Sequence, residues 1–127
     1  MGHKGTWCRL AKAYSEELLT EAKTLNKPII IDFYADWCSP CSKLEEITFH
    51  DAVLVKQAKQ DFITIKVDLT RKDNPVHEHL LKEYGIKGVP TVVFLNRKGN
   101  ERDDLRLEDF LPADQFLIRM AETKKLF

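Results

Sequence analysis

The feature that most constrains the fold is a pair of cysteines, Cys38 and Cys41, between an apolar run and a helical pattern. Residues 29–34 are apolar and β-rich without alternation, which is typical of a central strand covered on both faces. A helical pattern begins at about Ser39, and residues 62–67 then alternate between apolar and polar side chains. The two thiols are therefore predicted to lie at the start of a helix inside a β-α-β unit.

Caps and periodicity predict the remaining elements. Three more helices are expected, one beginning after an N-cap at Ser15, one between Asn74 and Gly85, and one opening at Pro112. Residues 91–95 are predicted to form a strand, and residues 103–107 are predicted to return antiparallel to it.

The element order predicts the fold class. The helix that begins near Ser39 is expected to be kinked or divided at residues 48–51. The order α, β, α, β, α, β, β, α predicts an α/β fold with a central mixed β-sheet and helices on both faces. We expect one domain over residues 14–127 after an extension of residues 1–13. Residues 1–5 are consistent with a cloning remnant that replaced a signal peptide or upstream domains.

The composition narrows the classes of partner that the protein is expected to bind. The 20 Lys and Arg residues cancel the 20 Asp and Glu residues, so no net field favours binding to nucleic acid or an anionic membrane. No run approaches the roughly 18 apolar residues of a membrane span, so direct membrane insertion is not expected. We expect small molecules or other proteins as partners. We also expect the protein to be a monomer and to use no cofactor. Cys8, beside Trp7 in a segment expected to be frayed, is interpreted as a bystander thiol.

Two cysteines at this spacing can perform thiol chemistry. A thiolate at a helix N-terminus faces unsatisfied N–H groups and the positive end of the helix dipole, so Cys38 is the candidate nucleophile. Cys41 lies on the same side of the first turn and can attack a mixed disulfide formed at Cys38. Trp37 is expected to shield the pair and to offer an apolar contact surface.

Two alternatives use the same cysteines. They could form half of a zinc site, although the nearest histidines, His77 and His79, are two apart on a helix and point to different sides. The sequence therefore predicts no metal. A purely structural disulfide is the second alternative, but closing so short a loop removes little unfolded-state entropy.

Two carboxylates are candidates for tuning the thiols. Asp32 lies within the apolar run, so burial should raise its pKa and let it act as general base for Cys41. The alternative is an acid at a strand edge that faces water. Glu45, four residues after Cys41, could reach back toward the thiols or be an ordinary surface glutamate. Lys66 could pair with Asp32 from the next strand or be exposed.

Residues 88–91 form the third informative stretch, with the sequence Gly-Val-Pro-Thr. A proline here can simply cap the start of the strand. If the bond between Val89 and Pro90 is cis, it would instead expose the preceding backbone to an extended substrate that pairs with it as a strand.

Together these motifs resemble the thioredoxin superfamily. Residues 37–41, the acid six positions before Cys38, and residues 88–91 occur in the expected order, and the resemblance covers about residues 14–123. Residues 34–38, with the sequence Tyr-Ala-Asp-Trp-Cys, are most similar to the C-terminal thioredoxin-like domain of the bacterial thiol:disulfide interchange proteins DsbD.

The resemblance implies a thioredoxin-like fold and a set of roles. It implies that Cys38 attacks, that Cys41 resolves, that Asp32 and Glu45 tune the thiols, and that Pro90 is cis. Trp37, Val89 and Pro90 are the expected substrate-binding residues. In such domains electrons pass from a membrane-embedded thiol reductant to disulfide-bearing periplasmic proteins. The resemblance therefore implies an extracytoplasmic location in bacteria, and a cytoplasmic one is the alternative.

The residues also indicate the direction of electron flow. Strong oxidants of this superfamily stabilise the thiolate, often with a histidine between the cysteines, whereas Ser39 and Pro40 carry no charge. We therefore expect a reductant or relay, with a potential nearer the value of thioredoxin, about −270 mV, than that of DsbA, about −120 mV. A disulfide isomerase or oxidase and a redox-inactive binding module are the alternatives.

Overall fold

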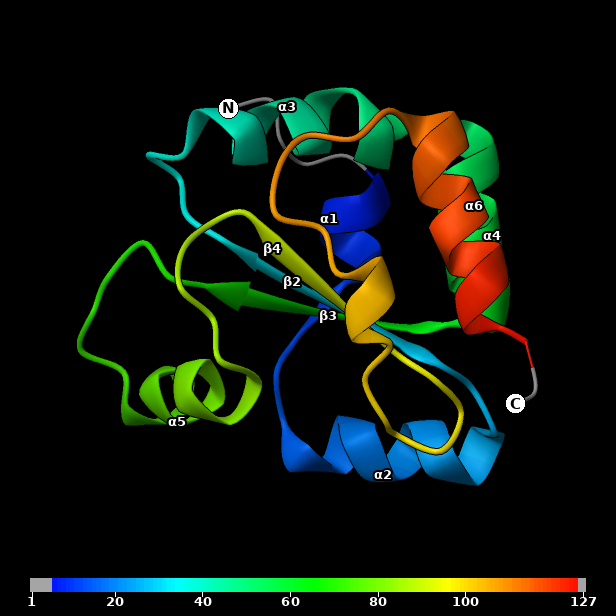
Figure 1. The fold of residues 1–127 in the computed structure, drawn as a ribbon, viewed down its shortest axis with the longest axis horizontal. Coiled ribbons are helices and arrows are strands. Elements are labelled where there is room, and N and C mark those ends of the chain that lie inside the picture. Colours follow the sequence, from blue (N-terminus) through cyan, green and yellow to red (C-terminus); the bar gives the residue numbers. More distant parts are fainter. Residues whose placement is uncertain (1–5, 126–127) are drawn as a thin grey trace.

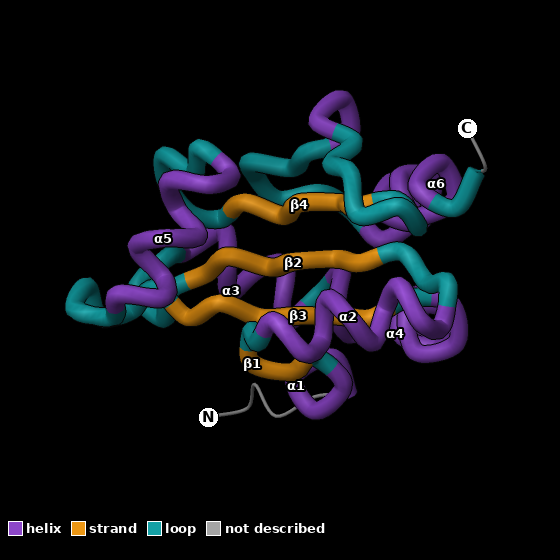
Figure 2. Tube along the Cα trace, turned by 90° about the horizontal axis from the view of Figure 1, so that it is seen from below, coloured by secondary structure: helices purple, strands orange, loops and turns teal. Residues whose placement is uncertain are grey.

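A mixed four-stranded sheet forms the centre of the computed structural model, which describes residues 6–125 without the side chains of Thr6 and Cys8 (Figure 1). The strands are β1 (Lys12–Ala13), β2 (Ile29–Tyr34), β3 (Ile63–Asp68) and β4 (Thr91–Leu95). Their spatial order is β1-β3-β2-β4 (Figure 2). Strand β4 runs antiparallel to β2, whereas the other described pairs are parallel.

Helices cover both faces of this sheet (Figure 1). On one face lie α2 (Glu16–Leu25) and α5 (Pro75–Tyr84). On the other face lie α1 (Thr6–Leu10), α3 (Ser39–Glu46), α4 (Ala52–Asp61) and α6 (Ala113–Thr123). The predicted α/β architecture, a central mixed sheet flanked by helices, is therefore confirmed.

Strand β2 contributes side chains to two separate hydrophobic cores, because successive side chains point to opposite faces of the sheet. Ile29, Ile31 and Phe33 pack with α2 and α5, whereas Ile30 packs with the helices of the opposite face. Asp32 shares the parity of Ile30 and therefore points toward the face that α3 covers.

The helix boundaries follow local capping. The hydroxyl oxygen of Ser15 accepts a hydrogen bond from the amide of Leu18 at 3.3 Å. Asn74 caps α5 through its side-chain oxygen, and Gly85 ends that helix with a φ of 61°, a conformation that suits glycine. These predicted caps are confirmed.

The predicted division of the central helix is also confirmed. Helix α3 ends at Glu46, a 3₁₀ turn η1 (Thr48–His50) follows, and α4 begins at Ala52. The carboxylate of Asp51 accepts a hydrogen bond from the amide of Leu54 at 2.9 Å and so starts a new helix.

The predicted strand at residues 103–107 is wrong. Residues Asp103–Leu105 form the 3₁₀ turn η2, and only isolated antiparallel bridges join this part of the chain to β4. One of them pairs Leu107 with Val92 through two backbone hydrogen bonds of 2.8 and 3.0 Å.

Local bonds explain this departure. The amide of Leu105 donates to the carbonyl oxygen of Arg102 at 3.0 Å, so the turn satisfies a group that a strand would have offered to its neighbour. The guanidinium of Arg102 also holds the Asp104 carboxylate with two hydrogen bonds of 2.8 and 2.9 Å.

Part of the predicted N-terminal extension packs against the rest of the domain. The ring of Trp7 is 2% exposed, stacks on Phe49 with centroids 4.0 Å apart, and meets Phe116 edge-on at 6.4 Å. Strand β1, which the sequence did not reveal, pairs with β3 immediately after α1. The predictions of a cloning remnant at residues 1–5 and of a bystander thiol at Cys8 lie outside the described residues and side chains.

Replacing Trp7 with alanine should therefore destabilise the fold by about 3 kcal/mol, the lower end of the range for a buried large aromatic residue. The lower end is expected because the indole N–H is buried without a hydrogen-bond partner among the described residues, so its removal relieves a cost. Guanidinium denaturation measures the change. Trp37→Ala is the matched control, because Trp37 is 62% exposed. Equal losses in the two variants would contradict the core role of Trp7.

Candidate active site

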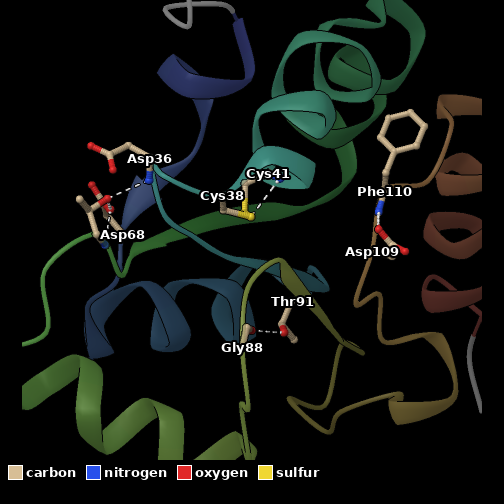
Figure 3. Close-up of a disulfide and its surroundings, with 9 residues drawn as sticks. Asp36, Cys38, Cys41, Asp68, Gly88, Thr91, Asp109 and Phe110 are labelled. Atoms are coloured by element: carbon tan, nitrogen blue, oxygen red, sulfur yellow. Dashed lines mark hydrogen bonds between the residues drawn. A yellow bond between two sulfur atoms is a disulfide. The ribbon is translucent and has the colours of Figure 1, made fainter.

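The two cysteines form a disulfide at the N-terminus of α3 (Figure 3). Cys38 is the N-cap residue, and Cys41 lies in the first turn with its Cα atom 5.2 Å from that of Cys38. Pro40 lies between them in the first turn, where a missing N–H leaves no intrahelical bond unmade. The local sequence thus holds both sulfur atoms at the start of a helix.

The helix N-terminus provides an electrostatic environment that favours a thiolate. The backbone amide of Cys41 donates to the sulfur of Cys38 at 3.2 Å, the position that a capping oxygen occupies in other helices. Both cysteines are mostly buried, at 5% and 7% exposure. After reduction, this amide and the helix dipole would stabilise negative charge on Cys38 in preference to Cys41.

Asp32 is a buried acid beneath this helix. Its side chain is 5% exposed, and burial, followed by the nearby charge of Glu45, raises its pKa from 3.8 to about 7. The expected rise in pKa is confirmed, and the alternative of a water-facing edge acid is wrong. Glu45 is half-buried on α3, and Lys66 is half-buried beside Asp32 in the β3 register.

The loop before β4 lies against the dithiol (Figure 3). Val89 packs on the buried cluster of Ala35, Cys38 and Cys41, and its bond to the buried Pro90 is cis, as the resemblance implied. The hydroxyl of Thr91 donates to the carbonyl oxygen of Gly88 at 2.7 Å and holds the loop in place.

Trp37 lies exposed at the edge of the site, and sequence reasoning missed what positions it. The amide of Asp36 donates to the hydroxyl oxygen of Thr70 at 3.0 Å, and the indole N–H of Trp37 donates to the Thr70 carbonyl oxygen at 3.4 Å. Asp68 in turn accepts hydrogen bonds from the amide and hydroxyl of Thr70. The only sequence signal was an Asp and a Thr two positions apart at the end of a strand, a common turn pattern.

A groove of about 510 Å³ opens beside Trp37 and Val89. Its other walls come from α5, from the segment between β3 and α5, and from residues 86–88. Val89 thus contacts the dithiol cluster and also lines the groove. Val89 therefore connects the groove to the cluster that holds the disulfide.

The histidines that the zinc alternative considered do not converge with the cysteines. His77 lines the groove, whereas Nε2 of His79 lies 3.5 Å from the carboxylate of Glu83. Across the part of the chain that the structure describes, no three His, Cys, Asp or Glu residues gather as metal ligands would. None of the described helices combines the length and apolar character that a membrane span requires.

Comparison with known proteins gives consistent matches. A family model described as a thioredoxin-like domain matches residues 15–124. The thiol:disulfide interchange protein DsbD of Vibrio vulnificus (strain CMCP6) is 39% identical over 102 residues, which make up 80% of this chain and 17% of that protein. DsbD of Yersinia pestis (strain Pestoides F) is 35% identical with the same coverage of both chains.

Solved structures show the same likeness. The crystal structure of the Neisseria meningitidis DsbD C-terminal domain in the oxidised form aligns with a TM-score of 0.70 and 29% identity, covering 90% of this chain and 99% of that one. A thioredoxin from Thermus thermophilus aligns with a TM-score of 0.74 at 23% identity, covering 89% and 85%, which shows a shared fold. The chain spans only about a sixth of the length of its curated relatives.

Proposed function

Because the chain belongs to the thioredoxin-like family, we propose that it is a thiol-disulfide oxidoreductase that reduces protein disulfides through Cys38 and Cys41. The observation that carries this proposal is the disulfide at the start of α3, where the amide of Cys41 points at the sulfur of Cys38. The similarity to the thiol:disulfide interchange proteins supports the same chemistry.

The reaction divides into two exchanges. In the reduced protein, the Cys38 thiolate attacks one sulfur of a client disulfide, so that the client S–S bond breaks, its other sulfur leaves as a thiolate, and a mixed disulfide forms. Asp32 then accepts the proton of the Cys41 thiol, and the Cys41 thiolate attacks the sulfur of Cys38. The second client thiolate leaves, two electrons have passed to the client, and the protein holds the Cys38–Cys41 disulfide.

The direction toward reduction has physical support. Neither Ser39 nor Pro40 provides a positive charge to the Cys38 thiolate, whereas Asp32 and Glu45 are carboxylates on the same side of the sheet as α3. Negative charge near the thiols opposes accumulation of the thiolate form and so favours donation of electrons.

The resemblance also supports a setting for this cycle. We infer an upstream thiol reductant, embedded in a membrane, that returns the Cys38–Cys41 disulfide to the dithiol. Disulfide-bearing proteins of a bacterial extracytoplasmic compartment are the inferred clients. We infer that the domain acts as a monomer and that Trp37, Val89 and Pro90 contact the client. The predicted start at residue 14 leaves out Trp7 of the core and β1 of the sheet, so we extend the proposed domain to include them.

The Cys41→Ser variant tests the proposal. Without the resolving thiol, the mixed disulfide at Cys38 should persist, so client proteins should be captured as adducts that dithiothreitol releases. Non-reducing electrophoresis followed by mass spectrometry detects them. The Cys38→Ser/Cys41→Ser variant is the control and should capture none. A protein that retains its partners irrespective of both cysteines would be a binding module, and the proposed exchange would be refuted.

A further inference from the structure

The groove beside the dithiol carries an excess of positive charge. Four cationic side chains line it, and Glu78 is the one carboxylate among its lining residues. The four cations are Arg71, Lys72, Lys82 and Lys87. All four are exposed, and none forms an ion pair with another side chain in residues 6–125. Their charges are therefore available to a partner.

Apolar side chains line the groove together with these cations. Trp37 and Val89 border the dithiol side of the groove, and Leu69, Leu81 and Ile86 continue the apolar surface toward α5. A groove that offers both apolar and cationic side chains suits an extended peptide, whose own side chains can contact one kind and then the other along its length. A small anion would leave the apolar side chains of the groove uncovered.

The distribution of charge points to two of the lysines. Asp36, Asp68 and Asp73 line an adjoining hollow of about 430 Å³, which also includes Arg71. Lys72, Lys82 and Lys87 line the groove but not the hollow, and Lys72 directly precedes Asp73 in the chain. The carboxylates of the hollow therefore offset the positive charges of Lys82 and Lys87 least.

We propose that the groove binds a client segment with acidic side chains near its disulfide-bonded cysteine, and that Lys82 and Lys87 select for these acidic side chains. The inference rests on the proposed function, because Cys38 must form a mixed disulfide with the client while the segment lies in the groove. Acidic clients should then be reduced faster than neutral or basic ones of the same shape.

Matched peptides measure this selectivity. Each carries one intramolecular disulfide with Glu, Gln or Lys at the same positions within four residues of a cysteine. Stopped-flow measurement with the reduced protein gives the second-order rate constant for each peptide. We expect the Glu peptide to react about fivefold faster than the Gln peptide, since exposed ion pairs contribute little individually, and the Lys peptide to react slowest. Raising the salt concentration from about 20 to 500 mM should reduce the difference.

Charge reversal assigns the effect to the groove. In Lys82→Glu/Lys87→Glu, the ratio of the Glu to the Gln rate constant should fall below one. The matched control is Lys56→Glu/Lys59→Glu, which makes the same change in net charge at exposed positions of α4, outside the groove, and should keep the wild-type ratio. Because the readout is a ratio, a general loss of folded protein cancels.

Equal rate constants for the Glu and Gln peptides would overturn the inference, and so would equal rate ratios in the two double variants. Oxidised glutathione serves as a small disulfide that carries carboxylates. If Lys82→Glu/Lys87→Glu changes only the rate constant for oxidised glutathione, and not those for the peptides, the inference is also overturned. Failure of the wild-type protein to reduce any of the peptides would instead refute the proposed function.

Discussion

Replacing Cys38 with serine is expected to abolish catalysed insulin reduction, so that the observed rate falls to that of dithiothreitol alone, because the nucleophile is lost. A serine hydroxyl at this helix N-terminus stays protonated at neutral pH, so neither the helix dipole nor the Cys41 amide can produce an attacking anion there. The turbidity of precipitating insulin chains, followed with time, measures the rate.

Cys8→Ser is the matched control for this experiment, because it removes the third thiol and leaves the Cys38–Cys41 pair intact. It should reduce insulin at the wild-type rate. Activity that survives in Cys38→Ser and disappears in Cys8→Ser would move the nucleophile to α1 and contradict the mechanism.

Replacing Asp32 with asparagine is expected to stabilise the oxidised protein at pH 8 by about 2 to 4 kcal/mol. The folded protein raises the pKa of Asp32 from 3.8 to about 7, so it holds this proton more tightly than the unfolded chain does. Wild-type stability should therefore fall as the pH rises from about 4 to about 7, where the folded protein must ionise a buried acid.

Guanidinium denaturation at pH 5 and pH 8 tests this expectation. The wild-type protein should lose stability between the two values, whereas Asp32→Asn should lose much less. Asp73→Asn, which changes an exposed carboxylate before α5, should behave as wild type. If Asp32→Asn and the wild-type protein lose equal stability, the buried acid does not govern this pH dependence.

The same substitution should slow client release. Asparagine cannot accept the proton of Cys41, so decay of the mixed disulfide should slow by about 100-fold at pH 7, the lower end for general base catalysis. Quenched samples separated by non-reducing chromatography measure this decay. The wild-type rate should rise with pH around 7, and that rise should be absent in the variant.

Much of the fold could be predicted because its signals are local. The caps Ser15 and Asn74 each bond to amides within the next three residues, and Asp51 divides a helix in the same way. The burial of Asp32 was predictable because an apolar run without alternation indicates a strand covered on both faces.

The features that escaped prediction depend on contacts between distant segments. Trp7 looked like part of a frayed terminus, but Phe49 and Phe116 provide a buried site for its ring. The role of Thr70 arises only when its loop meets Asp36, which lies 34 positions earlier. No pattern within a short window reports such contacts.

The predicted strand at residues 103–107 was wrong for a different reason. The turn expected at residues 96–100 made a returning strand plausible, residues 104–107 alternate between charged and apolar side chains, and both Leu105 and Leu107 are indeed buried. The ion pair between Arg102 and Asp104 and the turn at Leu105 were equally compatible with this pattern. Periodicity recorded which side chains are buried, but it did not determine the backbone conformation that buries them.

The edges of the sheet affect how readily copies of the protein aggregate. On one side, the bridges of Val92 with Leu107 and of Leu95 with Glu101 occupy the outer edge of β4. On the other side, β1 is only two residues long. Neither edge presents a long row of unpaired backbone groups, so strand-to-strand aggregation between copies is disfavoured. In the proposed cycle, the disulfide that opens lies at the start of α3 and at neither edge of the sheet, so its reduction does not uncover these edges.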